Sequence, residues 1–257
     1  MTTRVAMWSG PRNISTALMR SWEARGDSAV CDEPLYACYL QTTGRDHPGA
    51  AEVIAHHETD WRLVTEALTR GVVPGAKPIF YQKHMAHHLL PAIERRWITS
   101  LVNCFLIRDP RAMLTSLVKV IPNPTVEETG LPQQVELFDA ERDRTGRVPP
   151  VLDGRDVRTD PAGMLRSLCA AVGVAYTDRM LAWPPGPRPT DGIWARHWYD
   201  AVHRSTGFAP YALKPDAVPS HLAAVLAECQ GLYDRLAEYR LRPCPAAEPS
   251  SPPNRAS

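Results

Sequence analysis

The sequence is short of net charge, of long apolar runs and of paired cysteines, and each absence excludes a class of function. Its 29 lysines and arginines nearly balance 28 acidic residues, so the formal net charge is +1. A protein that binds nucleic acid needs a basic surface, so we expect no nucleic-acid partner. No apolar run approaches the roughly 20 residues of a membrane helix, and the first residues lack the apolar core of a signal peptide. We therefore expect a cytoplasmic protein with no membrane partner.

The six cysteines contain no Cys-x-x-Cys pair and no Cys/His spacing typical of a metal site. Cys104 and Cys169 lie in apolar stretches, where buried free thiols are common, and this favours a reducing compartment. Two histidine pairs, 56–57 and 87–88, raise the question of a metal. Because neighbouring residues on a helix do not face one site, and because no carboxylate or cysteine completes a ligand set, we expect solvated helix faces and no metal cofactor.

The most informative segment is a short apolar stretch, a turn and the start of an amphipathic run. Residues 4–8 predict a buried strand, which a Ser-Gly-Pro sequence then breaks. Backbone N–H groups at the N-terminus of the following helix can face an anion, Arg12 adds a fixed positive charge, and Ser15 and Thr16 add hydroxyl donors. Ile14 stands where a nucleoside-triphosphate P-loop has glycine, and the Gly-Lys-Ser/Thr ending is absent. The pattern predicts a phosphate or sulfate site, with a plain turn and an N-capping serine as the alternative.

A second segment supports the anion site. Residues 101–107 form a continuous apolar run suited to the middle of a parallel sheet. Arg108 follows directly, at the carboxyl end of that strand, where open α/β sheets bind their ligands. Ser116 lies about two turns into the next helical run. An arginine fork with a hydroxyl eight residues later can hold one phosphate between the strand end and the helix.

Together these segments resemble the sulfotransferases that use 3′-phosphoadenosine 5′-phosphosulfate. In that family a loop such as Pro-Lys-Ser-Gly-Thr-Thr binds the 5′-phosphosulfate, and residues 11–16 (Pro-Arg-Asn-Ile-Ser-Thr) occupy the same places. The family's arginine and the serine eight residues later bind the 3′-phosphate, and Arg108 and Ser116 keep that spacing. A late strand and helix at 151–169 also match, so the resemblance spans most of residues 4–182. It implies this donor as co-substrate, a small-molecule acceptor, no metal, and donor contacts from Arg12, Asn13, Ile14, Ser15, Thr16, Arg108 and Ser116.

Three departures from the family pattern bear on the donor site. Arg12 replaces the usual loop lysine, and Ile14 replaces a glycine, so the loop must take a conformation that a β-branched residue tolerates. Ala17 stands where many eukaryotic cytosolic members carry a tryptophan that stacks on adenine. Trp194 and Trp198 are four residues apart and would share a helix face. They are either core residues or a stacking surface, and Trp198 is our candidate for the adenine contact.

Transfer to a hydroxyl needs a base, and two residues compete for that role. Lys83-His84 at a predicted strand end resembles the family's Lys-x-His segment, in which the histidine is the base. Here the two are adjacent, and this difference turns His84 to the other sheet face if the strand stays regular. Glu33 follows another predicted strand and resembles the glutamate base of carbohydrate and tyrosyl-protein sulfotransferases. The sequence leaves both open and favours Glu33 slightly; Lys83 is a further candidate.

Strands and helices alternate along the chain, which predicts a three-layer α/β/α sandwich on a mainly parallel sheet, the P-loop nucleoside-triphosphate-hydrolase-like sulfotransferase fold. We expect one domain over 1–242 and a disordered tail over 243–257. Helical runs are predicted at 50–70, through Leu89 to Trp97, and at 222–241. The proline-broken stretch after residue 121 predicts a surface excursion or lid, and 183–192 a loop. The acceptor pocket is expected to be lined by loops within residues 34–60 and 121–147.

The leading hypothesis is an enzyme that transfers a sulfuryl group to a small acceptor by in-line displacement without a metal. A small-molecule kinase is the alternative within enzymes, but it needs Mg²⁺ and a Lys-Ser/Thr loop ending. A non-catalytic relative that binds a nucleotide or an anion is the alternative of another class, and Arg12 and Ile14 keep it open. The sequence also leaves a homodimer open and does not name the acceptor.

Overall fold

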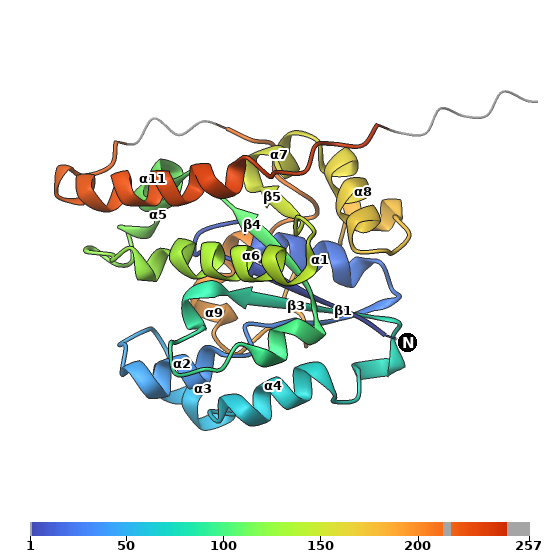
Figure 1. Cartoon of the computed structure of the whole chain (residues 1–257). Coiled ribbons are helices and arrows are strands. Elements are labelled where there is room, and N and C mark those ends of the chain that lie inside the picture. Colours follow the sequence, from blue (N-terminus) through green and yellow to red (C-terminus); the bar gives the residue numbers. More distant parts are fainter. Residues whose placement is uncertain (1, 213–216, 246–257) are drawn as a thin grey trace, which may run out of the picture.

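A computed structural model describes residues 2–212 and 217–245 of the 257-residue chain. Five parallel strands form one sheet in the order β2-β3-β1-β4-β5. The strands are β1 (Thr3–Ser9), β2 (Ser28–Asp32), β3 (Ile79–Met85), β4 (Val102–Ile107) and β5 (Val151–Asp153). Helices cover both faces (Figure 1), so the prediction of a three-layer α/β/α sandwich is confirmed.

Side chains alternate between the two faces of the sheet and build two separate cores. On one face, Val5 and Met7 of β1 pack with α1 (Ser15–Ala24) and α8 (Pro161–Ala171). On the other face, Ala6 and Trp8 pack with α4 (Trp61–Thr69), α6 (Leu131–Thr145) and α11 (Ala223–Ala237). The four side chains from β1 are fully buried, as expected for the central strand of a parallel sheet.

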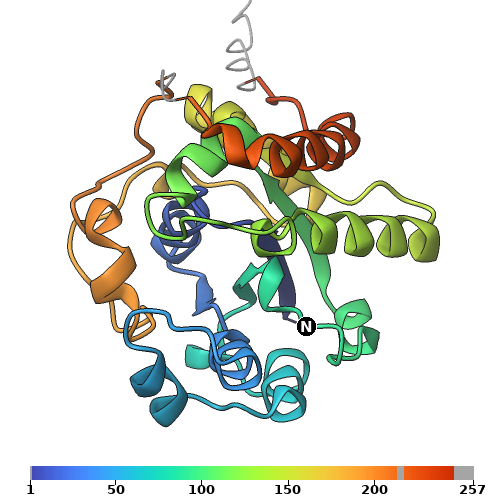
Figure 2. The same ribbon diagram turned by 90° about the vertical axis from the view of Figure 1, so that its left-hand side faces the viewer.

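The remaining helices are short and connect or flank these layers. They are α2 (Tyr36–Thr43), α3 (Ala50–His56), α5 (Pro110–Leu117), α7 (Gly154–Thr159), α9 (Ala195–Trp198) and α10 (Asp200–His203), with 3₁₀ turns at η1 (Pro74–Ala76), η2 (Ala86–His88), η3 (Arg96–Ser100), η4 (Glu127–Thr129), η5 (Asp178–Leu181) and η6 (Ser220–Leu222). Figure 2 shows α9 and α10, in orange, on the same side of the molecule as the blue helices α2 and α3.

Several helix predictions need correction. The helix expected through Leu89 to Trp97 is absent: residues 89–95 form no helix and lie between the 3₁₀ turns η2 and η3, because Pro91 lacks an N–H donor and restricts the residue before it. The run at 50–70 divides into α3 and α4, since Asp60 caps a new helix by accepting a bond from the Arg62 N–H at 2.8 Å.

The stretch predicted as a lid after residue 121 is largely helical and part of the core. Its segment 131–145 is α6, which buries Leu131, Val135 and Phe138 against the sheet. Pro132 lies in the first turn, where a missing N–H costs nothing, so this proline starts a helix instead of breaking one. The helix predicted at 222–241 is confirmed as α11, and the loop predicted at 183–192 is confirmed as well. Most of the tail expected to be disordered, residues 246–257, lies outside the described residues.

Candidate active site

The loop between β1 and α1 forms one end of a cavity above the carboxyl ends of the strands. A Cβ atom on Gly10 would lie 2.4 Å from the carbonyl oxygen of Thr129, so only glycine fits this close approach. Asn13 fastens the loop to β4, because its Nδ2 donates to the Leu106 carbonyl at 3.2 Å and its Oδ1 accepts from the Ile14 N–H at 2.8 Å. The N-cap position of α1 is Ile14, whose side chain makes no capping hydrogen bond, contrary to the alternative of an N-capping serine. The first amide groups of α1 are therefore available to an anion.

Three guanidinium groups gather beside this loop, at what we call the phosphate end of the cavity. Arg108 donates to the Arg12 carbonyl, and Arg12 Nε donates to Ser116 Oγ at 3.0 Å. Arg158 of α7 lines the same end and donates through Nε to the Ala209 carbonyl at 2.8 Å. Burial lowers the pKa of Arg108, and the charges of Arg158 and Arg12 lower it further. A concentration of like charges of this kind favours a bound anion.

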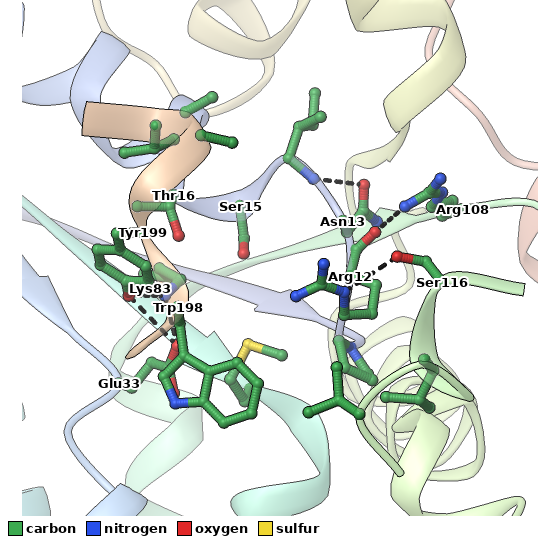
Figure 3. A pocket seen from close by; sticks show the side chains of 18 of the residues that line it. Arg12, Asn13, Ser15, Thr16, Glu33, Lys83, Arg108, Ser116, Trp198 and Tyr199 are labelled. Carbon is green, nitrogen blue, oxygen red and sulfur yellow. Dashed lines mark hydrogen bonds and ion pairs between the residues drawn. The ribbon is translucent and has the colours of Figure 1, made fainter. Parts of the chain in front are cut away.

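The cavity has a volume of about 440 Å³ and extends from the loop to a carboxylate–lysine cluster on the opposite side. Figure 3 shows the arrangement: Arg12, Arg108 and Ser116 lie on one side, and Glu33, Lys83 and Tyr199 on the other. The structure thus brings together most of the side chains predicted from the sequence. Those that line the cavity are Arg12, Asn13, Ile14, Ser15, Thr16, Glu33, Lys83, Arg108, Ser116 and Trp198.

The cluster consists of two carboxylates, one ammonium group and one phenol. Asp32 ends β2 and pairs in register with Lys83 of β3, which brings their side chains to one edge. The Lys83 ammonium donates to Asp32 Oδ1 at 2.8 Å, to Glu33 Oε1 at 2.5 Å and to the Tyr199 hydroxyl at 2.6 Å. Tyr199 in turn donates to Asp32 Oδ2 at 2.7 Å, and its oxygen accepts from the Trp194 indole at 3.3 Å. Lys83, Asp32 and Tyr199 are buried, whereas Glu33 reaches the cavity.

Burial and neighbouring charges set the protonation of this cluster. Burial opposes the charge of Lys83, but Asp32 and Glu33 outweigh that effect and raise the lysine pKa, so the ammonium form persists. Burial also raises the pKa of Glu33; Lys83 lowers it, and the charge of Asp32 raises it again. Because Asp32 also accepts from Lys83, Glu33 is not the sole counter-ion. Glu33 is therefore a carboxylate poised to accept a proton.

Two residues at the cavity have backbone conformations that non-glycine residues rarely adopt. Arg12 has a φ of 57° and Glu33 a φ of 41°. Such conformations cost on the order of 1–3 kcal/mol each and are found where the surrounding structure fixes a side chain for function. In this protein they direct one cation and one carboxylate into the same cavity.

His84 lies on the other face of the sheet and does not line the cavity. Strand β3 remains regular to Met85, so the period-two alternation directs Lys83 and His84 to opposite faces. The His84 ring stacks on Trp8 with centroids 4.3 Å apart, and Nε2 lies 3.2 Å from Gln82 Oε1. Burial lowers the pKa of His84 to about 3. The geometry thus gives His84 a packing position and leaves Glu33 as the candidate base.

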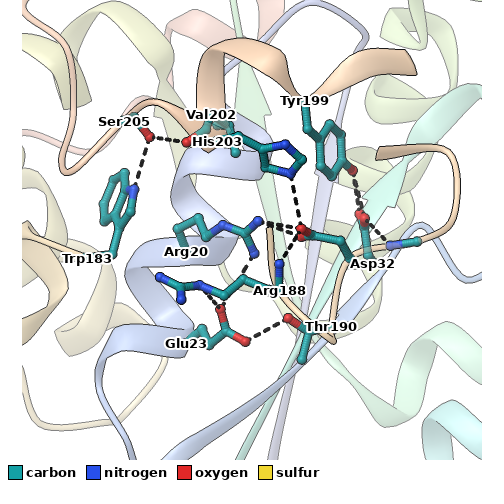
Figure 4. Close-up of polar contacts among 12 residues, drawn as sticks. Arg20, Glu23, Asp32, Trp183, Arg188, Thr190, Tyr199, Val202, His203 and Ser205 are labelled. Carbon is teal, nitrogen blue, oxygen red and sulfur yellow. Dashed lines mark hydrogen bonds and ion pairs between the residues drawn. The ribbon is translucent and has the colours of Figure 1, made fainter. Parts of the chain in front are cut away.

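A segment that we call the strap (residues 183–210) crosses the site and delivers Trp198 and Tyr199. The fully buried Arg20 of α1 bonds Asp191 at 2.6 Å, and His203 Nε2 lies 3.3 Å from the same carboxylate. The Gly192 N–H also donates to Asp32 Oδ2 at 3.2 Å. Figure 4 labels Arg20, Asp32, Tyr199 and His203 within this network. Charged groups buried inside such a network resist separation, so the strap is held firmly against α1.

Trp198 lies near the end of the cavity opposite the arginines. Its ring is 6.3 Å from the His47 ring, and its indole lies close to the Tyr36 hydroxyl. The phosphate end of the strap instead carries Phe208, which lines the cavity beside Ala209, the partner of Arg158. Trp198 is therefore badly placed for the predicted adenine contact, and Phe208 is better placed.

The end of the cavity near Trp198, called here the far end, is lined by aromatic and imidazole rings. Tyr36 and Tyr39 each stack on His88 with centroids 4.7 Å apart, and the Tyr36 hydroxyl lies 2.9 Å from His47 Nδ1. His87 also lines the cavity. The expectation of solvated helix faces is correct for the exposed pair at 56–57 and wrong for the pair at 87–88, since η2 turns His88 into the interior.

Sequence reasoning assigned no role to Arg158, Asp32 or Tyr199. Arg158 could have been found, because it follows the last parallel strand at the edge where ligands bind. Tyr199 could not, since nothing local links it to Lys83.

No helix of the described ranges is both long and apolar enough to span a membrane. Within those ranges there is also no group of three His, Cys, Asp or Glu side chains arranged to hold a metal ion.

Two plant proteins are similar to most of this chain. Two Arabidopsis thaliana proteins called branched-chain-amino-acid aminotransferase-like protein 2 and protein 1 are each 35% identical to the chain, over 229 and 232 residues. These matches cover 89% and 90% of the chain but only 40% and 41% of the relatives, so the chain spans about two fifths of their length. The name of these relatives therefore describes proteins much longer than this chain.

The fold is shared with solved sulfotransferases. A sulfotransferase from Alicyclobacillus acidocaldarius superposes with a TM-score of 0.53 at 12% identity, covering 94% of this chain and 98% of its own. The sulfotransferase domain of the Synechococcus PCC 7002 olefin synthase gives 0.52 at 16% identity, with the same coverage. A family model described as a sulfotransferase domain matches residues 3–234, nearly the whole chain. The chain belongs to the sulfotransferase domain family.

Proposed function

We propose that the protein transfers a sulfuryl group from 3′-phosphoadenosine 5′-phosphosulfate to a hydroxyl of a small molecule. The observation that carries this proposal is one cavity with Arg12, Arg108 and Arg158 at one end and the Glu33 carboxylate at the other. Sulfuryl transfer, like phosphoryl transfer, depends mostly on positioning and on stabilising charge. It needs a cationic cradle for the donor and a base for the acceptor, and Arg12 and Glu33 provide them in one space.

The residues at the phosphate end fit the two anionic groups of this donor. In the proposed complex, the uncapped N-terminus of α1, with Ser15 and Thr16, binds the 5′-phosphosulfate. Arg108 and Ser116 bind the 3′-phosphate, and Arg158 adds a third guanidinium that the family resemblance did not supply. The adenine then lies beside Phe208. Three neighbouring cations lower the cost of holding two such anions together.

Glu33 is the base in this proposal. With the donor supplying an activated sulfur, Glu33 takes the acceptor's hydroxyl proton as the acceptor oxygen bonds to sulfur. The bond from sulfur to the bridging phosphate oxygen breaks in the same step, and Arg12 stabilises the charge that accumulates on the departing phosphate. Lys83 stays charged between Asp32 and Glu33 and holds the carboxylate at its place in the cavity.

Calorimetry with three nucleotides tests the donor. 3′-Phosphoadenosine 5′-phosphate should bind at least about tenfold more tightly than adenosine 5′-phosphate, because only the former reaches the guanidinium group of Arg108. ATP with Mg²⁺ should bind more weakly than either. Tight ATP·Mg²⁺ binding without a preference for the 3′-phosphate would instead support the kinase alternative. Release of 3′-phosphoadenosine 5′-phosphate from the sulfated donor in the presence of a mixture of hydroxyl acceptors separates an enzyme from a non-catalytic binder.

A further inference from the structure

We propose that the acceptor is an uncharged molecule with a second hydroxyl group, and that this hydroxyl hydrogen-bonds to His87 or His88 at the far end of the cavity. This inference rests on the proposed function, since it concerns the molecule that Glu33 would deprotonate. It assigns the far end as the part of the site that selects the acceptor.

The two imidazoles have hydrogen-bonding capacity that the protein leaves unused. His88 is 2% exposed, and the Nδ1 atoms of both His87 and His88 are buried without a partner among the described residues. Both rings also line the cavity, and no hydrogen bond within the described residues uses either imidazole, so a ligand hydroxyl that bonds to one of them gains affinity. Burial and neighbouring positive charge lower the pKa of both rings, to about 3 for His87, so both are neutral at physiological pH. A hydroxyl can donate to or accept from a neutral imidazole, whichever tautomer is present.

Aromatic packing holds these rings in place. His88 lies parallel to Tyr36, with an interplanar angle of 8°, and is also stacked on Tyr39. His87 meets Tyr39 edge to face, with centroids 5.4 Å apart. Rings fixed in this way lose little entropy when a ligand binds. The two imidazole rings are therefore preorganised for a specific contact.

The far end lies close enough to Glu33 for one small molecule to reach both. Tyr36 is three residues from Glu33, and its N–H donates to the Glu33 carbonyl at 3.0 Å. The charge of Glu33 acts on the Tyr36 hydroxyl, and the same tyrosine ring covers His88. One hydroxyl of an acceptor can thus face Glu33 while a second faces an imidazole, with Tyr36 along the connecting wall.

The charges around the far end disfavour an acidic acceptor. The arginines that line the described cavity all lie at the phosphate end, and Lys83 is bound by Asp32 and Glu33. Arg45, beside the far end, pairs with the buried Glu128 at 2.9 Å. Glu33 and Glu128 therefore face the acceptor, and the positive charges of Lys83 and Arg45 beside them are already paired with carboxylates. A carboxylate or phosphate on the acceptor would be repelled.

Affinities of matched probes test this inference without turnover. Calorimetry on protein saturated with 3′-phosphoadenosine 5′-phosphate compares 2,6-dihydroxynaphthalene, 6-methyl-2-naphthol and 6-hydroxy-2-naphthoate, and a shorter series of hydroquinone, 4-methylphenol and 4-hydroxybenzoate. In at least one series the diol should bind about 3- to 10-fold more tightly than its methyl analogue, the range of a single neutral hydrogen bond. The carboxylate should bind at least about tenfold more weakly than the methyl compound.

Variants assign the preference to the imidazoles. His87→Phe and His88→Phe each keep a flat ring and remove the nitrogen atoms, and His56→Phe is the control because His56 is exposed and does not line the cavity. At least one of the first two should bind diol and methyl analogue within about twofold of each other, and the control should keep the preference. Thermal melting and nucleotide affinity verify that each variant is folded.

The inference is overturned if both variants keep the diol preference, if neither series shows it, or if the carboxylate binds best. Failure of the nucleotide to bind is a different result. In that case the proposed function falls, and the same probes measured on the protein alone still decide whether His87 and His88 select a hydroxyl.

Discussion

Replacement of Tyr199 by phenylalanine removes one oxygen atom from the buried cluster and tests whether that cluster is as tightly coupled as its geometry indicates. The hydroxyl donates to Asp32 and accepts from Lys83 and from the Trp194 indole, at 2.7, 2.6 and 3.3 Å. A hydrogen bond to a charged group is worth about 1.5–3 kcal/mol, and an indole N–H left without a partner adds about 1 kcal/mol. Because Asp32 and Lys83 still bond each other, one charged hydrogen bond is counted, and we expect Tyr199→Phe to lower the free energy of unfolding by about 2.5–4 kcal/mol.

Thermal and urea unfolding measure this loss. For a chain of this size the expected fall in Tm is about 5–15 °C. Tyr176→Phe is the matched control, because the Tyr176 hydroxyl donates to Asp178 at a similar 2.8 Å but at the surface. Its effect should stay below about 1 kcal/mol, since solvent replaces the lost bond.

A second readout distinguishes coupling from a simple packing defect. Without the Tyr199 hydroxyl, which lies 3.4 Å from Glu33 Oε1 and bonds Lys83, the position of the Glu33 carboxylate is less well fixed. The kcat should therefore fall while affinity for 3′-phosphoadenosine 5′-phosphate stays near wild type. Equal stabilities of Tyr199→Phe and wild type, within about 0.5 kcal/mol, would refute the reasoning. So would equal losses in Tyr199→Phe and Tyr176→Phe.

Three further outcomes are expected. Arg108→Ala should weaken 3′-phosphoadenosine 5′-phosphate binding by about 1.5–3 kcal/mol in calorimetry, whereas Ala at the nearby, exposed Arg111 in the first turn of α5 should not. Arg12→Ala should lower kcat about 100-fold in steady-state assays, with Arg12→Lys intermediate. Because burial raises the pKa of Glu33, and the base acts when deprotonated, kcat should fall as pH drops through a value above that of an ordinary glutamate. Glu33→Gln should remove this fall at low pH and lower kcat about 100-fold, and His84→Asn should leave the pH–rate profile unchanged.

The parts of the site that depend on local pattern could be predicted from the sequence. The strand, turn and helix around Arg12 are defined by an apolar run and its break, and the position of Arg108 follows from the strand before it. The alternation of side chains along β3 also decides between Lys83 and His84, once the strand is known to remain regular to Met85.

The other parts depend on contacts between distant segments. Tyr199 joins Asp32 across 167 residues, and no spacing rule connects them. The error over residues 121–147 has a different cause: prolines were counted as breakers, although Pro132 lies in the first turn of α6, where proline is favourable. His88 was placed on a solvated face because a helix was expected there, while the 3₁₀ turn η2 directs its ring inward.

The long reach of the strap has a consequence for biosynthesis. Lys83 and Tyr199 are 116 residues apart. At the usual rate of about 5–20 residues per second, Tyr199 leaves the ribosome roughly 6–23 s after Lys83. During that interval β2 and β3 can pair, but the ammonium and carboxylate groups at their ends lack the phenol that later covers them. The buried cluster of Asp32, Lys83 and Tyr199 can therefore form only after the strap has been synthesised.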